Sequence, residues 1–174
     1  MKYINKIIIL LSVLVFFQTS LSADVPYYVD FKFILNESSA GKGAQKYLKD
    51  KLSNGIKKIQ EKEKNIQEEE KKIIQQKKII SADEYKKKVN SLRKKVTSLR
   101  DERNTLLDNV AKQRTKARNE LLKNLNPILK DYMKEKKIRM VIDKKSLLLA
   151  DESLDITKDI LKILNTKLKS IKLN

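Results

Sequence analysis

The feature that most constrains this chain is a run of apolar residues at strict seven-residue spacing. An isoleucine or leucine occupies five successive heptad positions, at Leu52, Ile59, Ile66, Ile73 and Ile80. Most of the residues between them are Lys, Glu, Gln or Asn. A seven-residue apolar period is typical of a coiled-coil seam. The sequence therefore predicts a long helix that packs along one narrow stripe against another helix.

The first 22 residues have the three parts of a secretory signal peptide. Lys2 and Lys6 give a positive start, residues 7–17 form an apolar run, and residues 20–22 (Ser-Leu-Ser) supply small side chains for cleavage near Ser22. The alternative is an uncleaved anchor, but eleven apolar residues fall short of the roughly 20 that cross a bilayer. We therefore expect export from the cytoplasm and a soluble mature protein.

The chain is strongly basic, with 40 Lys and Arg against 22 Asp and Glu. Removal of the leader lowers the net charge only from +18 to +16. Such a charge favours acidic partners: anionic lipid, lipopolysaccharide, nucleic acid or an acidic protein surface. The chain has no Cys and no His, which excludes disulfides, thiolate catalysis and a histidine pH switch. No phosphate loop, Ser-His-Asp set or metal-ligand spacing is found, so we expect no enzyme activity, no metal and no cofactor.

A helix-start signal divides the central segment into two predicted helices. Residues 81–84 (Ser-Ala-Asp-Glu) have the form of a capping box, in which the serine accepts a hydrogen bond from the third helical amide. The helices expected over residues 42–80 and 82–124 are each roughly 60 Å long. Two arms of nearly equal length at a capped turn fit an antiparallel hairpin better than one rod of about 130 Å. We predict a coiled-coil hairpin over residues 42–126.

The two predicted arms differ in the quality of their seams. The second seam row of the first arm is mostly polar, since it reads Ile56, Glu63, Glu70 and Lys77. The second arm has two better rows: Tyr85, Leu92, Leu99 and Leu106 on one, and Val89, Val96, Arg103, Val110 and Ala117 on the other, with Arg103 as the interruption. A thin seam buries little apolar surface. We therefore expect a flexible arm.

Strand-like segments lie on both sides of the hairpin. Residues 25–35 alternate between two faces and predict one strand, residues 138–142 predict a second, and residues 146–149 would add another. Pro127 is expected to end or kink the second helix, and a short helix then runs to Lys137. Asp155 is expected to cap a last helix with the apolar face Ile156, Ile160, Leu164, Leu168 and Ile171.

These pieces predict a small body, formed by residues 23–41 and 127–174, at the base of the hairpin. So few residues rarely bury a sufficient core alone, so we expect strands from several chains to complete the body. The expected fold class is α+β and mostly α: a long antiparallel coiled-coil hairpin on a small β-sheet body completed by oligomerisation. The candidate subunit contacts are Tyr28, Val29, Phe31, Met140, Val141, Ile142, Ile156 and Ile160.

Short motifs at both ends of the chain carry a family resemblance. Residues 28–30 (Tyr-Val-Asp), 34–38 (Ile-Leu-Asn-Glu-Ser) and 40–45 begin the chain, and residues 140–143 (Met-Val-Ile-Asp), 149–151 and 154–161 close it. Together with the leader and the basic hairpin, they resemble the Skp (OmpH) family of periplasmic chaperones. The resemblance implies a homotrimer whose hairpins surround a cavity like tentacles. It also implies ATP-independent holding of unfolded outer-membrane proteins in the periplasm.

The predicted tip of the hairpin is dense in positive charge. Residues 71–103 contain twelve Lys or Arg against four acidic residues. Collectively, this charge could attract acidic clients or an anionic membrane surface; for any single residue, a solvated helix face is the commoner explanation. The tip matches no lipopolysaccharide-binding pattern. The candidate binding residues are Lys77, Lys78, Lys86, Lys87, Lys88, Arg93, Lys94 and Lys95.

Acidic and tyrosine residues that could form a site have simpler structural explanations. Glu68, Glu69 and Glu70 are consecutive on a helix, so their side chains point about 100° apart and do not converge. Asp30, Asp143 and Asp155 are expected to end strands or cap helices. We expect packing roles for Tyr47, Tyr85 and Tyr132.

The function favoured by these features is an ATP-independent periplasmic holdase that keeps unfolded outer-membrane proteins from aggregating. The first alternative is a structural coiled-coil spacer or tether of the envelope without clients. A second alternative, a nucleic-acid-binding protein, is suggested by the charge, but the leader argues against a physiological role. The residues themselves predict that the chain associates with other copies of itself. The number of three subunits comes from the resemblance, and the sequence pattern identifies neither the clients nor the cavity-facing side of the arms.

Overall fold

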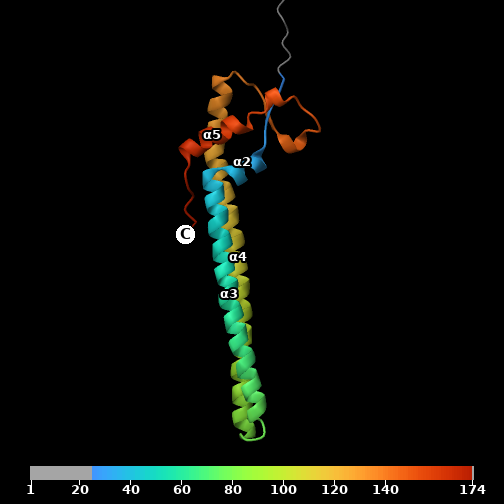
Figure 1. Cartoon of the computed structure of the whole chain (residues 1–174), viewed down its shortest axis with the longest axis vertical. Coiled ribbons are helices and arrows are strands. Elements are labelled where there is room, and N and C mark those ends of the chain that lie inside the picture. Colours follow the sequence, from blue (N-terminus) through green and yellow to red (C-terminus); the bar gives the residue numbers. More distant parts are fainter. Residues whose placement is uncertain (1–24, 174) are drawn as a thin grey trace, which may run out of the picture.

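The computed structural model describes residues 25–173, so the predicted leader, residues 1–22, lies outside the described part. A long helical hairpin projects from a small body at one end (Figure 1). The elements in chain order are β1 (Tyr27–Val29), α2 (Phe31–Glu37), α3 (Ser39–Gln76), α4 (Ala82–Glu135), β2 (Val141–Asp143), the 3₁₀ turns η1 (Lys144–Ser146) and η2 (Glu152–Leu154), and α5 (Thr157–Lys167). The predicted class, a mostly helical α+β fold with a small sheet, is confirmed.

Helices α3 and α4 form the predicted antiparallel hairpin. The start of α4 is as expected, because the Ser81 hydroxyl accepts a hydrogen bond from the Glu84 amide at 3.2 Å. The end of α3 is four residues earlier than predicted, at Gln76 rather than Ile80. The amides of Ile79 and Ile80 both donate to the Gln76 carbonyl, so these residues form the turn at the tip.

The heptad seam holds the hairpin together but buries few side chains fully. Ile59 and Ile73 are 7% and 5% exposed, whereas Leu52 and Ile66 are only half-buried. Across the seam, the predicted row of Tyr85, Leu92, Leu99 and Leu106 is also half-buried. The structure thus agrees with the expectation of a thin seam.

Helix α4 runs through Pro127 without ending there, so the predicted break and separate short helix are wrong. Pro127 lacks only one backbone donor, and Leu125 and Ile128 beside it are buried in the body, which holds the helix in place. The helix ends instead after Glu135, where Lys137 adopts a positive φ of 56°. There the Ile138 amide donates to the Met133 carbonyl at 2.8 Å, a Schellman arrangement that closes the helix.

The N-terminal segment is a strand for only three residues, so the predicted strand over residues 25–35 is wrong beyond Val29. The Asp30 carboxylate accepts a hydrogen bond from the Phe33 amide at 2.8 Å and thereby starts α2. The Ser38 hydroxyl, in turn, accepts from the Gly41 amide at 3.1 Å and starts α3. Gly41 is needed here because a Cβ atom would overlap the Leu35 carbonyl oxygen.

The sheet has two parallel strands, with Tyr27 paired to Val141 and Val29 paired to Asp143. The second strand therefore lies slightly later than the predicted residues 138–142. The further strand expected over residues 146–149 is not formed, because Ser146 ends η1 and the leucines after it extend into solvent. A two-stranded sheet of this size is marginal by itself.

The body nevertheless contains one apolar core within a single chain, contrary to the expectation that it would be too small. The last turns of α4 add apolar side chains to this core, and the sheet, α2 and α5 pack around them. Asp155 accepts a hydrogen bond from the Thr157 amide at 2.9 Å where α5 begins, but α5 ends at Lys167, before Leu168 and Ile171. The buried core residues are Val29, Ile34, Ala40, Leu121, Leu125, Ile128, Leu129, Ile138, Ile156, Ile160 and Leu164.

Candidate functional site

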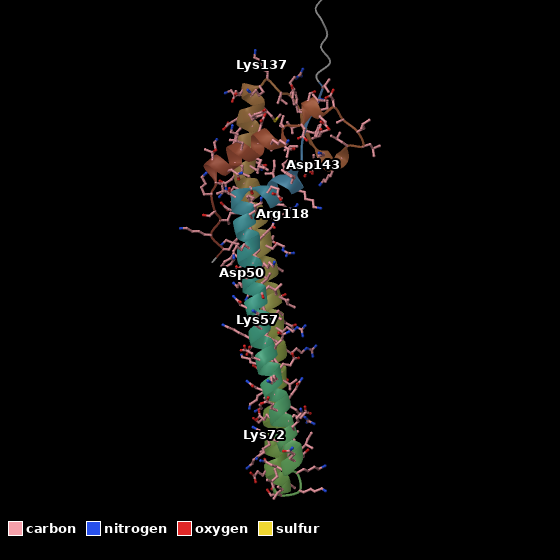
Figure 2. All side chains as sticks on the ribbon, in the orientation of Figure 1. Asp50, Lys57, Lys72, Arg118, Lys137 and Asp143 are labelled. Carbon is pink, nitrogen blue, oxygen red and sulfur yellow. The ribbon has the colours of Figure 1, made fainter. Side chains whose placement is uncertain are left out.

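The basic residues predicted at the tip lie together around the turn between α3 and α4. Lys78, Lys86, Lys87, Arg93 and Lys94 are exposed. Figure 2 shows charged side chains pointing outward along the whole arm, with Lys72 close to the tip. This geometry presents a dense positive charge at the point of the arm farthest from the body.

Three of the eight candidate residues have contacts within the arm. The Lys88 ammonium donates to the Gln76 side chain at 2.7 Å, and Lys95 pairs with Glu69 at 2.6 Å. Lys77 lies 5.8 Å from the centroid of the Tyr85 ring. These residues help to hold the two helices together, so the structure assigns them a local role in addition to their charge.

Two adjoining hollows on one side of the arm were not predicted from the sequence. They share Lys62, Ser98 and Glu102 in their walls, and their volumes are about 280 and 480 Å³. Apolar side chains of the seam line both hollows, and the Lys62–Glu102 ion pair, at 2.5 Å, spans the two helices there. The heptad pattern placed Ile59, Ile66 and Leu106 in the seam, but it carries no signal for a hollow beside them.

A third hollow lies on the body beside the sheet and has a volume of about 500 Å³. It is bordered by Leu148 and Leu149, which are 106% and 93% exposed. Lys144 lies over the Tyr28 ring, 5.8 Å from its centroid, and 3.6 Å from the Asp155 carboxylate. Exposed large apolar side chains that gather in this way are typical of a contact surface.

The predicted subunit contacts divide into three groups. Val29, Ile156 and Ile160 are buried in the core of one chain, so their burial needs no partner subunit. Met140, by contrast, is 58% exposed. The remaining candidates lie on or beside the sheet and are buried or half-buried: Tyr28, Phe31, Val141 and Ile142.

Asp30 and Asp143 cap local structure, as predicted, but the prediction for Asp155 is wrong, because Ile156 occupies the cap position of α5. The carboxylates of Asp30 and Asp143 accept hydrogen bonds from backbone amides that follow them. Burial alone would raise the pKa of Asp155, but its hydrogen bonds from Thr157 and the nearby Lys144 ammonium outweigh burial and lower that pKa. Within residues 25–173, no three or more carboxylates gather as a metal site.

Tyr132 connects the end of α4 to α5. Its hydroxyl donates a hydrogen bond to the Asp159 carboxylate at 2.6 Å. Burial of the ring and this hydrogen bond raise the pKa of Tyr132 to about 12, so the phenol stays protonated at neutral pH. The residue therefore has the packing role that was expected.

Comparison with known proteins supports one family. The family described as "Outer membrane protein (OmpH-like)" matches residues 27–164. Among solved structures, the chain is similar to an OmpH-like protein of Caulobacter crescentus CB15, described as a candidate outer membrane chaperone, with a TM-score of 0.79. The two are 18% identical, and the match covers 90% of this chain and 94% of the other. No curated protein matches the sequence significantly.

Proposed function

The chain belongs to the OmpH-like outer membrane protein family, and on this premise we propose that it is an ATP-independent periplasmic holdase. Its clients would be unfolded outer-membrane proteins, which it keeps from aggregating between its basic helical arms. The observation that carries the proposal is the shape itself: a long basic hairpin, with partly uncovered seam residues, on a body with exposed leucines. A precursor of a β-barrel suits such a surface, because its unpaired strands and apolar stripes aggregate in water.

Two kinds of contact would act together on a client. The tip charge attracts acidic segments over a distance, an effect that salt weakens because the Debye length is about 8 Å at physiological ionic strength. The hollows along the arm then offer small apolar surfaces between charged walls. Contacts of this kind are individually weak, and folding of the client into the membrane would be enough to release it.

The body supports a homotrimer as the working assembly. The sheet has only two strands, and Met140, Leu148 and Leu149 expose apolar surface near it. Strands or loops of neighbouring subunits would cover these side chains and arrange three arms around a cavity. Analytical ultracentrifugation of the purified protein tests this assembly, and a species of monomer mass at micromolar concentration would contradict it.

Export by the predicted leader would place the protein in the periplasm. None of the helices within residues 25–173 is long and apolar enough to cross a membrane. A mature N-terminus near residue 23, found by mass spectrometry of protein from the periplasmic fraction, is the expected result. An intact leader on that protein would contradict it.

The central test is light scattering of a urea-unfolded outer-membrane barrel protein diluted with and without this protein. We expect suppression of aggregation near stoichiometric amounts of oligomer. Replacing the exposed residues Lys86, Lys87 and Lys94 with Gln should weaken capture roughly tenfold at 150 mM salt and much less at 500 mM, because the attraction is electrostatic. The matched control replaces three exposed lysines away from the tip with Gln: Lys49, Lys57 and Lys123.

The outcomes separate the candidate functions. Unchanged scattering at both salt concentrations would contradict the chaperone function and favour a structural tether. Equal effects of the tip and control variants would show that total charge matters and that the tip has no special role.

A further inference from the structure

The residues that follow α5 form an extended strap, residues 168–173, that runs back beside the start of α3 (Figure 1). Leu173 is 4% exposed and packs against Leu48 of α3 and Val110 of α4. Ile171 bridges the core of the body and this second apolar cluster. The strap lies beyond residues 27–164, the part that matches the family.

One side chain connects both arm helices to the strap. Gln113 of α4 donates from its amide nitrogen to the Leu173 carbonyl at 2.7 Å. The oxygen of the same amide accepts a hydrogen bond from the Lys51 ammonium of α3 at 3.0 Å. The strap thus covers a surface of α3 and α4, called the groove below, that combines the apolar side chains of Leu48 and Val110 with the Gln113 amide, which holds the backbone of an extended chain.

The strap is attached weakly for its length. Leu168 packs against the body core, and its amide donates to the Leu164 carbonyl at 2.8 Å. Beyond it, one buried leucine, one half-buried isoleucine and the Gln113 hydrogen bond must offset the entropy of ordering residues 169–173. Lys169 and Lys172 extend into solvent and contribute no apolar contact. A segment held in this way can leave its groove at little cost.

We propose that the groove between α3 and α4 beneath the strap binds an extended segment of a client, and that the strap is its intrachain occupant. The proposal rests on the proposed function. Ile171 and Leu173 are two positions apart, as are the apolar side chains on one face of a β-strand. Segments of an unfolded β-barrel have the same alternation. They can therefore make the same apolar contacts and backbone hydrogen bond in the groove as the strap does. The strap keeps apolar surface covered when no client is bound.

The first test compares the affinity of a urea-unfolded outer-membrane barrel protein for four forms of the chain, measured by fluorescence titration. A chain that ends after Lys167 and the variant Leu173→Ser should both bind several-fold more tightly than the full chain. The matched control, Lys172→Ser, changes an exposed neighbour and should leave the affinity unchanged. Thermal melting verifies that each form is folded. If the shortened chain does not fold, the Leu173→Ser variant alone tests the proposal.

The second test locates the binding by photo-crosslinking from position 113 in the full chain, with p-benzoylphenylalanine in place of Gln113. Without client, the crosslink should form to residues 168–173, and saturating client should shift it to the client. A crosslink that stays within the chain while scattering shows the client bound would overturn the groove proposal and leave the holdase function intact. Equal or weaker binding by the Leu173→Ser variant would overturn it as well. Absence of client capture by the unaltered full chain would instead contradict the holdase function.

Discussion

The body and the arm are built from the same chain but are stabilised in different ways. In the body, buried side chains from the sheet, α2, α4 and α5 meet in one cluster, and Ile34, Leu125, Ile160 and Leu164 have no exposed surface. In the arm beyond the strap, the two helices meet along one seam, and charged residues lie on the other faces (Figure 2). Regions with few buried apolar contacts open at a low cost in free energy. We therefore expect the arm to bend and open more readily than the body.

The largest expected effect on stability comes from a substitution that creates a cavity in the body. Ile160→Ala should lower the free energy of unfolding by about 2–5 kcal/mol, because the side chain is fully buried and its neighbours come from several elements. Ile73→Ala, in the seam near the tip, should cost at most about 2 kcal/mol, because the half-open seam can close around the gap. Urea unfolding of both variants measures the difference. Equal losses would mean that the arm is as tightly packed as the body.

Alanine substitutions at two glycines of α3 test how tightly the arm seam is packed. Gly43→Ala should stabilise α3 by about 1 kcal/mol, because the site is exposed and a Cβ atom there meets no neighbour within 4 Å. Gly55→Ala adds the same helix propensity but overlaps the Leu106 side chain. We expect it to be less stable than Gly43→Ala by about 1–2 kcal/mol. Thermal melting compares the two, and equal stabilisation would show that the seam at Gly55 is loose.

The smallest expected effect concerns the charge at the start of α5 in the body. The pKa of Asp155 is lowered in the folded protein, so its contribution is complete above the unfolded pKa of about 3.9 and is lost as pH falls through the lower folded value. Asp155→Asn should therefore lower stability at pH 7 by about 0.5–1 kcal/mol. The loss relative to the unaltered protein should shrink below about pH 4.

Urea unfolding at pH 7 and pH 3 measures this dependence. A loss from Asp155→Asn that is the same at both pH values would show that hydrogen-bond geometry, and not the ionised carboxylate, stabilises the start of α5.

The candidate surfaces that the structure shows could be predicted from the sequence only in part. The tip lysines were predictable because charge density depends on composition along a helix. The hollows beside Lys62 and Glu102 were not, because they arise from how the side chains of two helices fit together across the seam. The strap contact of Leu173 was also missed, since a single leucine after a helix carries no periodic signal.

What the sequence determined by itself was local. The heptad period and the Ser81 capping signal were enough to predict two helices that meet at a turn, because each depends on neighbours along one helix. Only the tertiary structure decided the rest. It ended β1 at Val29, since the Asp30 cap prevailed over an alternating pattern. It also carried α4 past Pro127, because burial of Leu125 and Ile128 in a core assembled from distant segments offsets the loss of one hydrogen bond.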